Sequence, residues 1–300
     1  PRRRLLAMGG MFGGSFMAHR IVRKRPLIPG RTTELVIHAP QIAAKARPGN
    51  FVILRVHDKG ERIPLTIANT DRNDGTITLV YLVLGKTTAM LDTLHAGDAI
   101  LDLCGPLGKP TAIRRLPAPV VCVGGGTGIA AMHHIAKGHR LAGNTVIGII
   151  GARSKDLLLF EPELRLICHE VLVATDDGSR GRKGLVTRVL EERLACEGRI
   201  AEVLAVGPVP MMAAVSEVAG RFGVPCQVSL NAIMLDGIGM CGACRVTVGG
   251  ETRFACVDGP EFDGTQVDFQ ELSQRLTAFR PLEQLAYEEF EKSHVCHCTN

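Results

Sequence analysis

The segment PVVCVGGGTGIAAMHHI, residues 119–135, decides the fold of the middle of this 300-residue chain. It begins with an apolar run of strand type, continues through four glycines in five positions, and ends in an apolar helical pattern. A strand that leads through a glycine turn into a helix brings backbone N–H groups close to a pyrophosphate. The segment therefore predicts a nucleotide-binding turn with a threonine as helix cap. Its residues are Gly124, Gly125, Gly126, Thr127 and Gly128.

The residues after this turn alternate between strand and helix patterns. Strand-like runs occupy 145–150, 169–175 and 201–207, and helices are expected at 162–167, at 185–194 and from Pro210 onward. Repeated strand–helix units are typical of a parallel sheet, and ligands bind at the carboxyl ends of its strands. We therefore predict an α/β domain over 113–228. A glycine turn in a fold that binds no nucleotide remains open on these patterns alone.

Three cysteines set among glycines occur in the segment DGIGMCGACRVTVGGETRFAC, residues 236–256. Plant-type [2Fe-2S] proteins space their ligands as a first cysteine, four residues, a second, two residues, a third, and a distant fourth. Three of these positions hold cysteine here, and Asp236 occupies the first. The segment therefore predicts a [2Fe-2S] site. Its expected ligands are Asp236, Cys241, Cys244 and Cys256.

Glycines in this segment support a cluster, because Gly237, Gly239 and Gly242 can adopt positive φ and let backbone N–H groups approach the sulfides. A zinc site remains an alternative, although the fourth soft ligand that zinc requires is missing from the segment. Small buried cysteines with no ligand role remain another. Asp236 can also be a loop aspartate that bonds to nearby N–H groups.

The rest of the C-terminal third is expected to frame this segment. A strand at 226–234 leads into it, and RVTVGGETRFAC reads as a hairpin with two glycines as its turn, which brings Cys256 back to the other cysteines. A charged helical pattern over 268–292, interrupted at Pro281, is expected to pack outside or to meet a partner. The tail contains His294, Cys296, His297 and Cys298, and we expect it to be incidental or weakly metal-binding.

The first third of the chain predicts an antiparallel barrel. Short β-rich runs alternate with turn signals about every ten residues, as in small β-barrels. The runs are 34–39, 51–56, 63–68, 76–83 and 99–108, with a short helix expected at 87–94.

Composition limits the class of protein. Apolar residues at 46% and charged residues at 22% are ordinary for a globular chain, and the length suggests two or three domains. Ten unevenly spaced cysteines fit free thiols in a reducing cytosol better than a secreted disulfide framework. The net charge of +5 comes partly from basic runs near the start, which read as solvated surface rather than as a nucleic-acid site. No apolar run is long enough to span a bilayer, and residues 1–16 read as an extension.

From the barrel onward the sequence resembles the ferredoxin-reductase superfamily. In that family the barrel binds flavin through an Arg-x-Tyr-Ser/Thr segment and a Gly-x-Gly-Thr segment at a helix start. The matching runs here are RIPLT and GKTT, although Arg62 lies one residue further from Thr66 and Thr87 replaces the second glycine. A cationic Arg62 and a helix N-terminus both favour a pyrophosphate. The residues implied for FAD are Arg62, Pro64, Leu65, Thr66, Tyr81, Val83, Gly85, Lys86, Thr87 and Thr88.

The same resemblance covers the α/β part. ATDDGSRGRKG resembles the segment after the third strand of the superfamily's nicotinamide domain, and GPVPMM resembles its Gly-Pro-x-x-Met turn. The residues implied for the nicotinamide nucleotide are Asp176, Asp177, Gly207, Pro208 and Met211. NADH is preferred over NADPH, although Arg153 and Lys155 can meet a 2′-phosphate.

Two adjacent histidines, His133 and His134, lie inside the helical pattern and point in different directions. We expect one surface histidine and one partly packed histidine rather than a metal or acid–base site.

The order of barrel, nucleotide domain and cluster is similar to that of the electron-transfer subunits of class 1B dihydroorotate dehydrogenase. Within this group the cluster segment most nearly resembles the small subunits of NADH-dependent reduced ferredoxin:NADP oxidoreductases, or sulfide dehydrogenases. Those subunits are similar to this chain in carrying aspartate at the position of Asp236, where the dihydroorotate relatives carry cysteine. The resemblance implies an extension over 1–16, an FAD-binding barrel over 17–112, an NAD-binding domain over 113–228, and a [2Fe-2S] domain with a helical tail over 229–300.

FAD, a [2Fe-2S] cluster and NAD(H) are the cofactors that this resemblance implies. The chain would exchange hydride with NAD(H) and pass single electrons to or from a larger, glutamate-synthase-beta-like subunit with its own flavin and [4Fe-4S] clusters, in an electron-bifurcating enzyme that reaches ferredoxin indirectly. Hydride transfer needs positioned rings rather than a protein acid or base, so no catalytic residue is predicted. The alternatives are a dihydroorotate dehydrogenase electron-transfer subunit and a non-catalytic redox-sensing protein. A cytoplasmic location, without nucleic-acid or membrane partners, is expected.

An aspartate ligand at Asp236 should make the reduction potential of the cluster depend on pH, because its oxygen is harder than a thiolate and can take up a proton on reduction. We expect Asp236→Cys to shift the potential and to weaken this dependence, measured by EPR-monitored redox titration at several pH values. An unchanged potential with an unchanged pH dependence would show that Asp236 is not a ligand.

Overall fold

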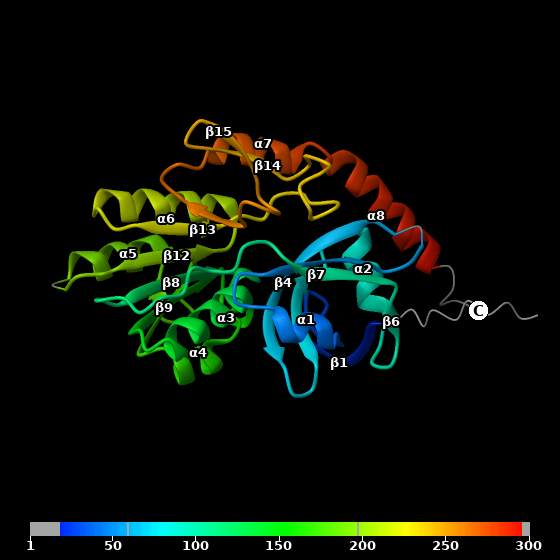
Figure 1. Cartoon of the computed structure of the whole chain (residues 1–300), viewed down its shortest axis with the longest axis horizontal. Helices are drawn as coiled ribbons and strands as arrows, with labels where there is room; N and C mark the ends of the chain where they lie inside the picture. Colours follow the sequence, from blue (N-terminus) through cyan, green and yellow to red (C-terminus); the bar gives the residue numbers. More distant parts are fainter. Residues whose placement is uncertain (1–18, 59, 197, 296–300) are drawn as a thin grey trace, which may run out of the picture.

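The computed structural model of the protein describes residues 19–58, 60–196 and 198–295. The predictions for the extension and for the side chains of the tail from His294 to Cys298 lie outside the described residues. Figure 1 shows a curved antiparallel sheet on the right, a sheet covered by helices on the left, and a C-terminal segment across the top that ends in α8 (Arg280–Val295). This arrangement confirms the predicted fold class.

The first sheet is a nearly closed antiparallel barrel of seven strands, in the order β6-β1-β2-β5-β4-β3-β7. Its edge strands β6 and β7 are separated in the chain only by Leu101, so the chain itself holds the two edges near each other. The strands are β1 (His19–Ile28), β2 (Thr32–His38), β3 (Phe51–Arg55), β4 (Arg62–Asp71), β5 (Thr76–Leu82), β6 (Ala99–Ile100) and β7 (Asp102–Leu107), and the helices between them are α1 (Pro40–Lys45) and α2 (Lys86–Thr93).

The strand β1 was not predicted from the sequence, because basic residues fill much of it and a bulge between Ile21 and Arg23 interrupts its period of two. Ile21 is buried, while Arg23 and Arg25 point outward and both form ion pairs with Glu34 on β2, at 3.2 and 3.1 Å. The basic run is therefore the outer face of a barrel strand.

The second sheet is parallel except for one edge strand, in the order β11-β10-β9-β8-β12-β13-β16. The chain runs outward from β8 through β9 to β10 and then returns to β12 on the other side. This reversal makes the carboxyl ends of β8 and β12 the switch point, where ligands bind in open α/β sheets. The strands are β8 (Val120–Gly125), β9 (Val146–Ala152), β10 (Glu170–Thr175), β11 (Arg182–Lys183), β12 (Glu202–Val206), β13 (Cys226–Ser229) and β16 (Glu261–Asp263).

Helices cover both faces of this sheet, as Figure 1 shows, with α3 and α4 on one side and α5 and α6 on the other. Each face buries its own apolar cluster, in which Met132 of α3 and Met212 of α6 are fully buried. Each side chain of this size contributes about 1.5–3 kcal/mol when it leaves water. The helices are α3 (Gly128–Leu141), α4 (Glu161–Ile167), α5 (Val186–Ala195) and α6 (Val209–Arg221), with a 3-10 turn η1 at Lys155–Leu157.

The C-terminal segment contains the predicted hairpin, made by β14 (Arg245–Val248) and β15 (Glu251–Phe254). Gly249 and Gly250 form its turn with φ of 60° and 79°, a conformation that favours glycine. The next strand, β16, pairs antiparallel with β13 and so extends the nucleotide sheet, which the sequence did not predict. The helix α7 (Phe269–Thr277) precedes α8, and Pro281 lies in the first turn of α8.

The barrel and the second sheet meet along α3. The imidazole Nδ1 of His134 lies 2.9 Å from the carbonyl oxygen of Ile67 on β4, and the ring of His133 packs against Phe160 with centroids 5.4 Å apart. Both histidines are therefore packed, and the expectation of a surface histidine was wrong because α3 is covered by the barrel on one side and by α4 on the other.

None of the helices in residues 19–295, apart from the two undescribed positions, has both the length and the apolar character needed to cross a membrane. The domain boundaries remain predictions.

Buried histidines make the stability of this fold sensitive to acid. Burial lowers the pKa of His133 and of His139 from 6.5 to about 4, and burial also lowers the pKa of His134. Between pH 6.5 and 4 these histidines bind protons in the unfolded chain but stay neutral in the folded chain. The free energy of unfolding should therefore fall as the pH decreases from 6.5 toward 4. Urea denaturation near pH 5 should report a net uptake of about one to two protons on unfolding, because Glu261, whose pKa burial raises to about 7, releases a proton in the same range.

A matched pair of variants tests this assignment. His139→Gln should reduce the proton uptake by about one, whereas His95→Gln, whose side chain is 83% exposed, should leave it unchanged. An identical slope in all three proteins would contradict the role of the buried histidines.

Candidate functional site

The two glycine turns at the switch point lie side by side. Gly124 pairs with Val206, so the turns that begin at Gly125 and Gly207 are neighbours at the carboxyl edge of the sheet. A Cβ atom on Gly125 would lie 2.5 Å from the sulfur of Met211, and one on Gly207 would lie 2.7 Å from its Cε. The thioether of Met211 therefore packs into both turns, and three predicted residues that are far apart in sequence come together.

The turn after β8 leaves backbone exposed to a ligand. Gly126 has a φ of 55° and nothing within 4 Å of where a Cβ atom would lie, so an anion can approach the turn, although the N–H of Gly126 itself donates to the carbonyl oxygen of Gly151 at 3.4 Å. Thr127 is at the N-cap of α3, but its side chain makes no capping hydrogen bond, so the capping prediction was wrong. The first N–H groups of α3 consequently have no side-chain partner, and the Thr127 hydroxyl is available to a phosphate.

The loops after β9 and β10 form a second, more distant part of the edge. The N–H of Asp176 donates to Ala152 and that of Asp177 donates to Arg153, each at 3.2 Å. The Asp177 carboxylate accepts from the hydroxyl and the N–H of Ser179, at 2.6 and 2.9 Å, and these bonds lower its pKa. The two exposed aspartates thus lie beside Arg153, and the Asp177 carboxylate shapes its own loop.

In the barrel, alternate residues of the predicted flavin segment face opposite ways. Pro64 and Thr66 pair with Ile53 and Phe51 on β3 and share their outer face. Leu65 points the other way and packs against the barrel core. The structure therefore places Pro64 and Thr66, but not Leu65, on a surface that a ring can reach.

Two further residues predicted for the flavin belong to the barrel interior. Tyr81 is only 1% exposed, and its hydroxyl donates to Asp92 on α2 at 3.0 Å. Val83 packs against the same core. Leu84, which no sequence motif indicated, is instead 79% exposed directly before the turn at Gly85. The signal available in the sequence was a leucine directly before the glycine of an expected turn.

The start of α2 uses its threonines internally. The Thr88 hydroxyl accepts from the N–H groups of Leu84 and Gly85, at 3.0 and 3.1 Å. Thr87 is buried and donates to the Glu61 carboxylate at 2.9 Å. The groups free to meet a pyrophosphate are therefore the N–H groups of the first helical turn. Arg62, next to Glu61, is exposed and forms no ion pair with any described carboxylate.

The cluster segment holds two of its cysteines together. Cys244 and Cys256 are each 1% exposed and their sulfurs are 3.1 Å apart, with the N–H of Cys256 directed at the sulfur of Cys244 at 3.5 Å. Burial raises the pKa of Cys256 to about 12, and the neighbouring thiol adds to the shift. The raised pKa means that the thiolate form of Cys256 is unfavourable in this buried position. A bound metal cation would offset the cost of forming the thiolate, because the thiolate is the form that ligates metals.

The other two predicted ligands lie on the exposed side of the same loop. Cys241 is exposed, and the Asp236 carboxylate accepts from the N–H groups of Ile238, Met240 and Cys241 at 3.0, 3.1 and 2.6 Å. These bonds lower the pKa of Asp236. Within the described residues no three His, Cys, Asp or Glu side chains converge on one metal position.

The donor set nevertheless fits an iron–sulfur cluster. A buried pair of soft sulfurs, a third cysteine on the same loop, and glycines at positive φ supply thiolates and approachable N–H groups. Those φ values are 74° at Gly237, 81° at Gly239 and 70° at Gly242. To ligate iron, Asp236 must exchange its N–H bonds for the metal, so both interpretations of this residue stay open.

The cluster loop rests directly on the barrel. A Cβ atom on Gly237 would lie 2.6 Å from Leu107 and 2.8 Å from Ile53, which pairs with Pro64. The loop therefore contacts the outer face of β3, next to the predicted flavin segment on β4.

Comparison with known proteins connects these sites. Residues 231–268 match the profile of the iron-sulfur cluster binding domain of dihydroorotate dehydrogenase B. A Thermotoga maritima protein, named as a homolog of the electron transfer subunit of dihydroorotate dehydrogenase B (NAD(+)), is 50% identical over 257 residues, or 86% of this chain and 90% of that protein. The corresponding Geobacillus kaustophilus electron transfer subunit is 35% identical over 255 residues, 82% of this chain and 96% of its own.

Solved structures agree. A chain of the NADH-dependent reduced ferredoxin-NADP oxidoreductase, a structure used to study flavin-based electron bifurcation, has a TM-score of 0.86 and 46% identity, covering 92% of this chain and 99% of that chain. The ferredoxin reductase of carbazole 1,9a-dioxygenase has a TM-score of 0.59 at 22% identity, covering 70% and 66%, and shares the fold. The resemblance predicted from the motifs is confirmed.

Gly128 is expected to be indispensable to the switch-point turn. A Cβ atom there would lie 2.5 Å from the backbone oxygen of Val206, which cannot move without displacing β12. Gly128→Ala should therefore lower the free energy of unfolding by about 2–3 kcal/mol. It should also weaken nucleotide binding, measured by calorimetry.

The matched control is Gly220→Ala in α6, where a Cβ atom would meet only Thr265 at an ordinary 3.7 Å. This change should stabilise the protein by about 0.5–1 kcal/mol. Equal stabilities for the two variants would contradict the close approach of α3 to β12.

Proposed function

Since this chain belongs to the family of dihydroorotate dehydrogenase B electron-transfer subunits, we propose that it is an electron-transfer subunit that exchanges hydride with NAD(H) and passes single electrons through a [2Fe-2S] cluster. It is a flavin oxidoreductase of the ferredoxin-reductase type and carries FAD. Its larger partner holds a second flavin and [4Fe-4S] clusters in an electron-bifurcating ferredoxin:NADP oxidoreductase.

One observation supports this function above the others: a single apolar cluster joins all three parts of the molecule. It contains Phe51 and Ile53 of the barrel, Val123 of the nucleotide sheet, and Cys244 and Cys256 of the cluster segment. Electron transfer between cofactors requires short, fixed separations, and a shared core fixes the separation of its parts.

The flavin is held at the outer face of β4 and at the start of α2. Arg62 and the first N–H groups of α2 bind its pyrophosphate, because both present positive charge or dipole to an anion. Pro64 and Thr66 lie against the ring, and the exposed Leu84 covers part of the bound cofactor.

The nicotinamide nucleotide is held at the switch point. Its pyrophosphate lies on the N–H groups of the turn from Gly125 to Gly128 and near the hydroxyl of Thr127. Gly207 and Met211 line the neighbouring turn, where a side chain on the glycine would collide with the methionine. Asp176 and Asp177 bind the outer end of the nucleotide, and the preference for NADH over NADPH remains a prediction.

A bound flavin would supply acceptance of a hydride from NADH and donation of single electrons to the cluster. The chain's own residues position the rings and exclude water, and none is required as an acid or base. Cys241, Cys244, Cys256 and Asp236 hold the cluster, with Asp236 leaving its loop N–H groups to do so.

We expect the partner surface to include the cluster loop and α8. Ile238 and Met240 on this loop are 60% and 81% exposed, and Leu282 and Leu285 on α8 are 64% and 57% exposed. Large apolar side chains that gather on the surface mark interaction sites. A dihydroorotate dehydrogenase partner is the second candidate, favoured by the names of the sequence relatives and disfavoured by the aspartate at 236.

The purified chain, reconstituted with FAD, iron and sulfide, should lose its flavin absorbance when NADH is added anaerobically, and an EPR signal from a reduced cluster should follow. Cys256→Ser should abolish the EPR signal while the flavin still bleaches, because the cysteine belongs to the cluster segment. The matched control is Cys196→Ser, an exposed cysteine at the end of α5 beside β10, near the opposite edge of the nucleotide sheet from β16, which should leave both signals intact. Absence of flavin bleaching in the unsubstituted protein would rule out the enzyme and favour a redox-sensing protein.

A further inference from the structure

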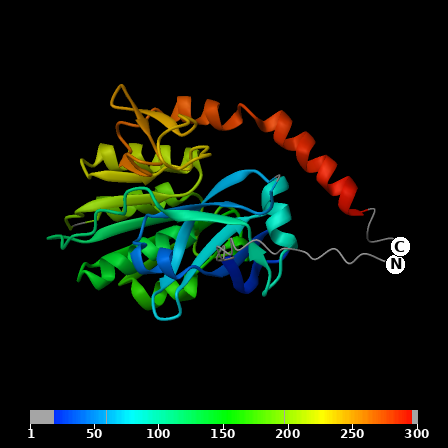
Figure 2. The same cartoon turned by 45° about the vertical axis from the view of Figure 1, so that its right-hand side comes forward.

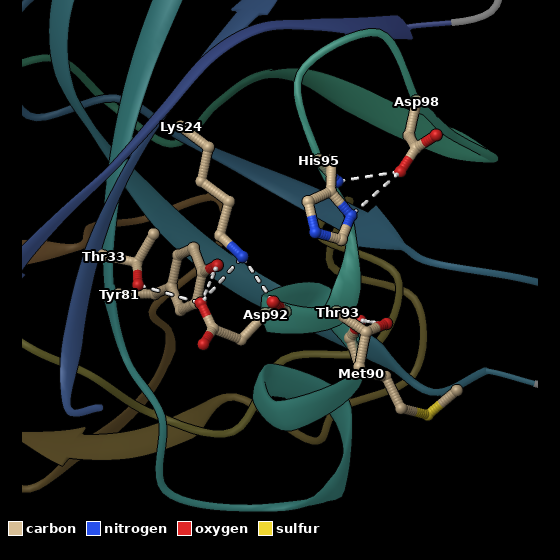
Figure 3. Close-up of polar contacts among 8 residues, drawn as sticks. All are labelled: Lys24, Thr33, Tyr81, Met90, Asp92, Thr93, His95 and Asp98. Atoms are coloured by element: carbon tan, nitrogen blue, oxygen red, sulfur yellow. Dashed lines mark hydrogen bonds and ion pairs between the residues drawn. The ribbon is translucent and has the colours of Figure 1, made fainter. Parts of the chain in front are cut away.

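The carboxylate of Asp92, in the last turn of α2, gathers partners from three barrel strands (Figure 3). It accepts hydrogen bonds from Thr33 on β2 at 2.9 Å and from Tyr81 on β5 at 3.0 Å. It also forms an ion pair with Lys24 on β1 at 3.2 Å, and the same amine donates to the backbone carbonyl of Asp92. A single side chain thus joins α2 to β1, β2 and β5.

The charge at this position runs against local electrostatics. A carboxylate at the C-terminal end of a helix is repelled by the helix dipole, and α2 has no basic residue of its own in that turn. Burial would raise the pKa of Asp92, but hydrogen bonds from Thr33, Lys24 and Tyr81 outweigh it and lower the pKa. Lys24 both neutralises the carboxylate and satisfies a terminal carbonyl of the helix. The barrel therefore keeps Asp92 ionised.

The helix needs this anchor because it buries few side chains. An eight-residue helix is unstable alone, and only Thr87 and Leu91 of α2 are buried. The hydroxyl of Thr87 donates to Glu61, and this contact lies at the opposite end of the helix from Asp92. Thr87 holds the start of the helix, Leu91 and the neighbouring α8 pack along it, and the contacts of Asp92 hold its C-terminal end.

We propose that Asp92 is a positioning residue for the flavin pyrophosphate: it fixes the axis of α2 and so aims the N–H groups at the start of the helix. This inference rests on the proposed function, in which those N–H groups bind FAD. Asp92 lies six residues, about 9 Å along the axis, from the first residue of α2, so it acts through the helix and does not touch the cofactor.

The test compares FAD with riboflavin, which lacks phosphates, on the full chain stripped of flavin. Asp92→Asn keeps the size of the side chain but removes its charge and its ion pair with Lys24. It should weaken FAD binding about tenfold, measured by fluorescence quenching, and leave riboflavin binding unchanged. Tyr81→Phe removes one hydrogen bond and leaves the charge, so it should weaken FAD binding about threefold. Asp92→Glu keeps the charge and should therefore bind FAD more tightly than Asp92→Asn, although less tightly than the unsubstituted chain.

Two controls separate positioning from general damage. Asp98→Asn changes an acidic residue in the neighbouring turn, where the carboxylate accepts from the N–H of His95 at 2.8 Å (Figure 3), and should leave FAD binding unchanged. Ile77→Val loosens the fully buried core at the start of β5, upstream of Tyr81, and should lower the thermal midpoint but not the FAD affinity.

Each outcome supports or overturns the proposal. If the unsubstituted chain fails to bind FAD, the proposed function is wrong. If it binds FAD and Asp92→Asn binds equally well, or loses riboflavin by the same factor as FAD, the positioning role is overturned. If Asp92→Asn does not fold, Tyr81→Phe decides the question by the same comparison of FAD with riboflavin.

Discussion

The outer face of β3 is the surface on which the rest of the molecule is assembled. Phe51 and Ile53 project from the barrel into the apolar cluster that contains Val121 and Val123 of the nucleotide sheet. Ile53 also meets the cluster loop at Gly237. Apolar packing of this density does not deform continuously, so the barrel, the sheet and the loop are held at one set of separations. Cofactors bound to these parts are therefore held at fixed distances from one another. Figure 2 shows the cluster segment above both sheets.

Polar contacts at the ends of short elements refine this packing. His134 joins α3 to the edge of β4, and Asp92 joins α2 to three strands. Both helices begin at a glycine-containing turn and present N–H groups at the start, where an anion binds. In each case a buried contact further along the helix fixes the direction of those groups. The short helix α2, which buries only Thr87 and Leu91, depends on its anchor because it has little stability of its own.

Local signals were predictable because each depends on neighbours in sequence. The glycine turn after β8, the two-glycine hairpin and the spacing of the cysteines are all set by backbone conformation within a few residues. Signals that depend on distant partners were missed. In β1 a bulge interrupts the period and places arginines opposite Glu34, and β16 is a strand only because β13 offers an edge. Leu65 lies in a run that matches the family's flavin motif and Tyr81 was implied for FAD, yet barrel register turns both inward.

The sequence alone determined the order of the three parts, the glycine turns and the identity of the candidate cluster ligands, since spacing and residue type encode them directly. Tertiary structure decided which of those residues can meet. It brought Gly125, Gly207 and Met211 together, directed Pro64 and Thr66 outward, and left Asp236 bonded to its own loop. The reason is geometric: strand register and the packing of one shared core fix the direction of a side chain, and neither is written in any single segment of the chain.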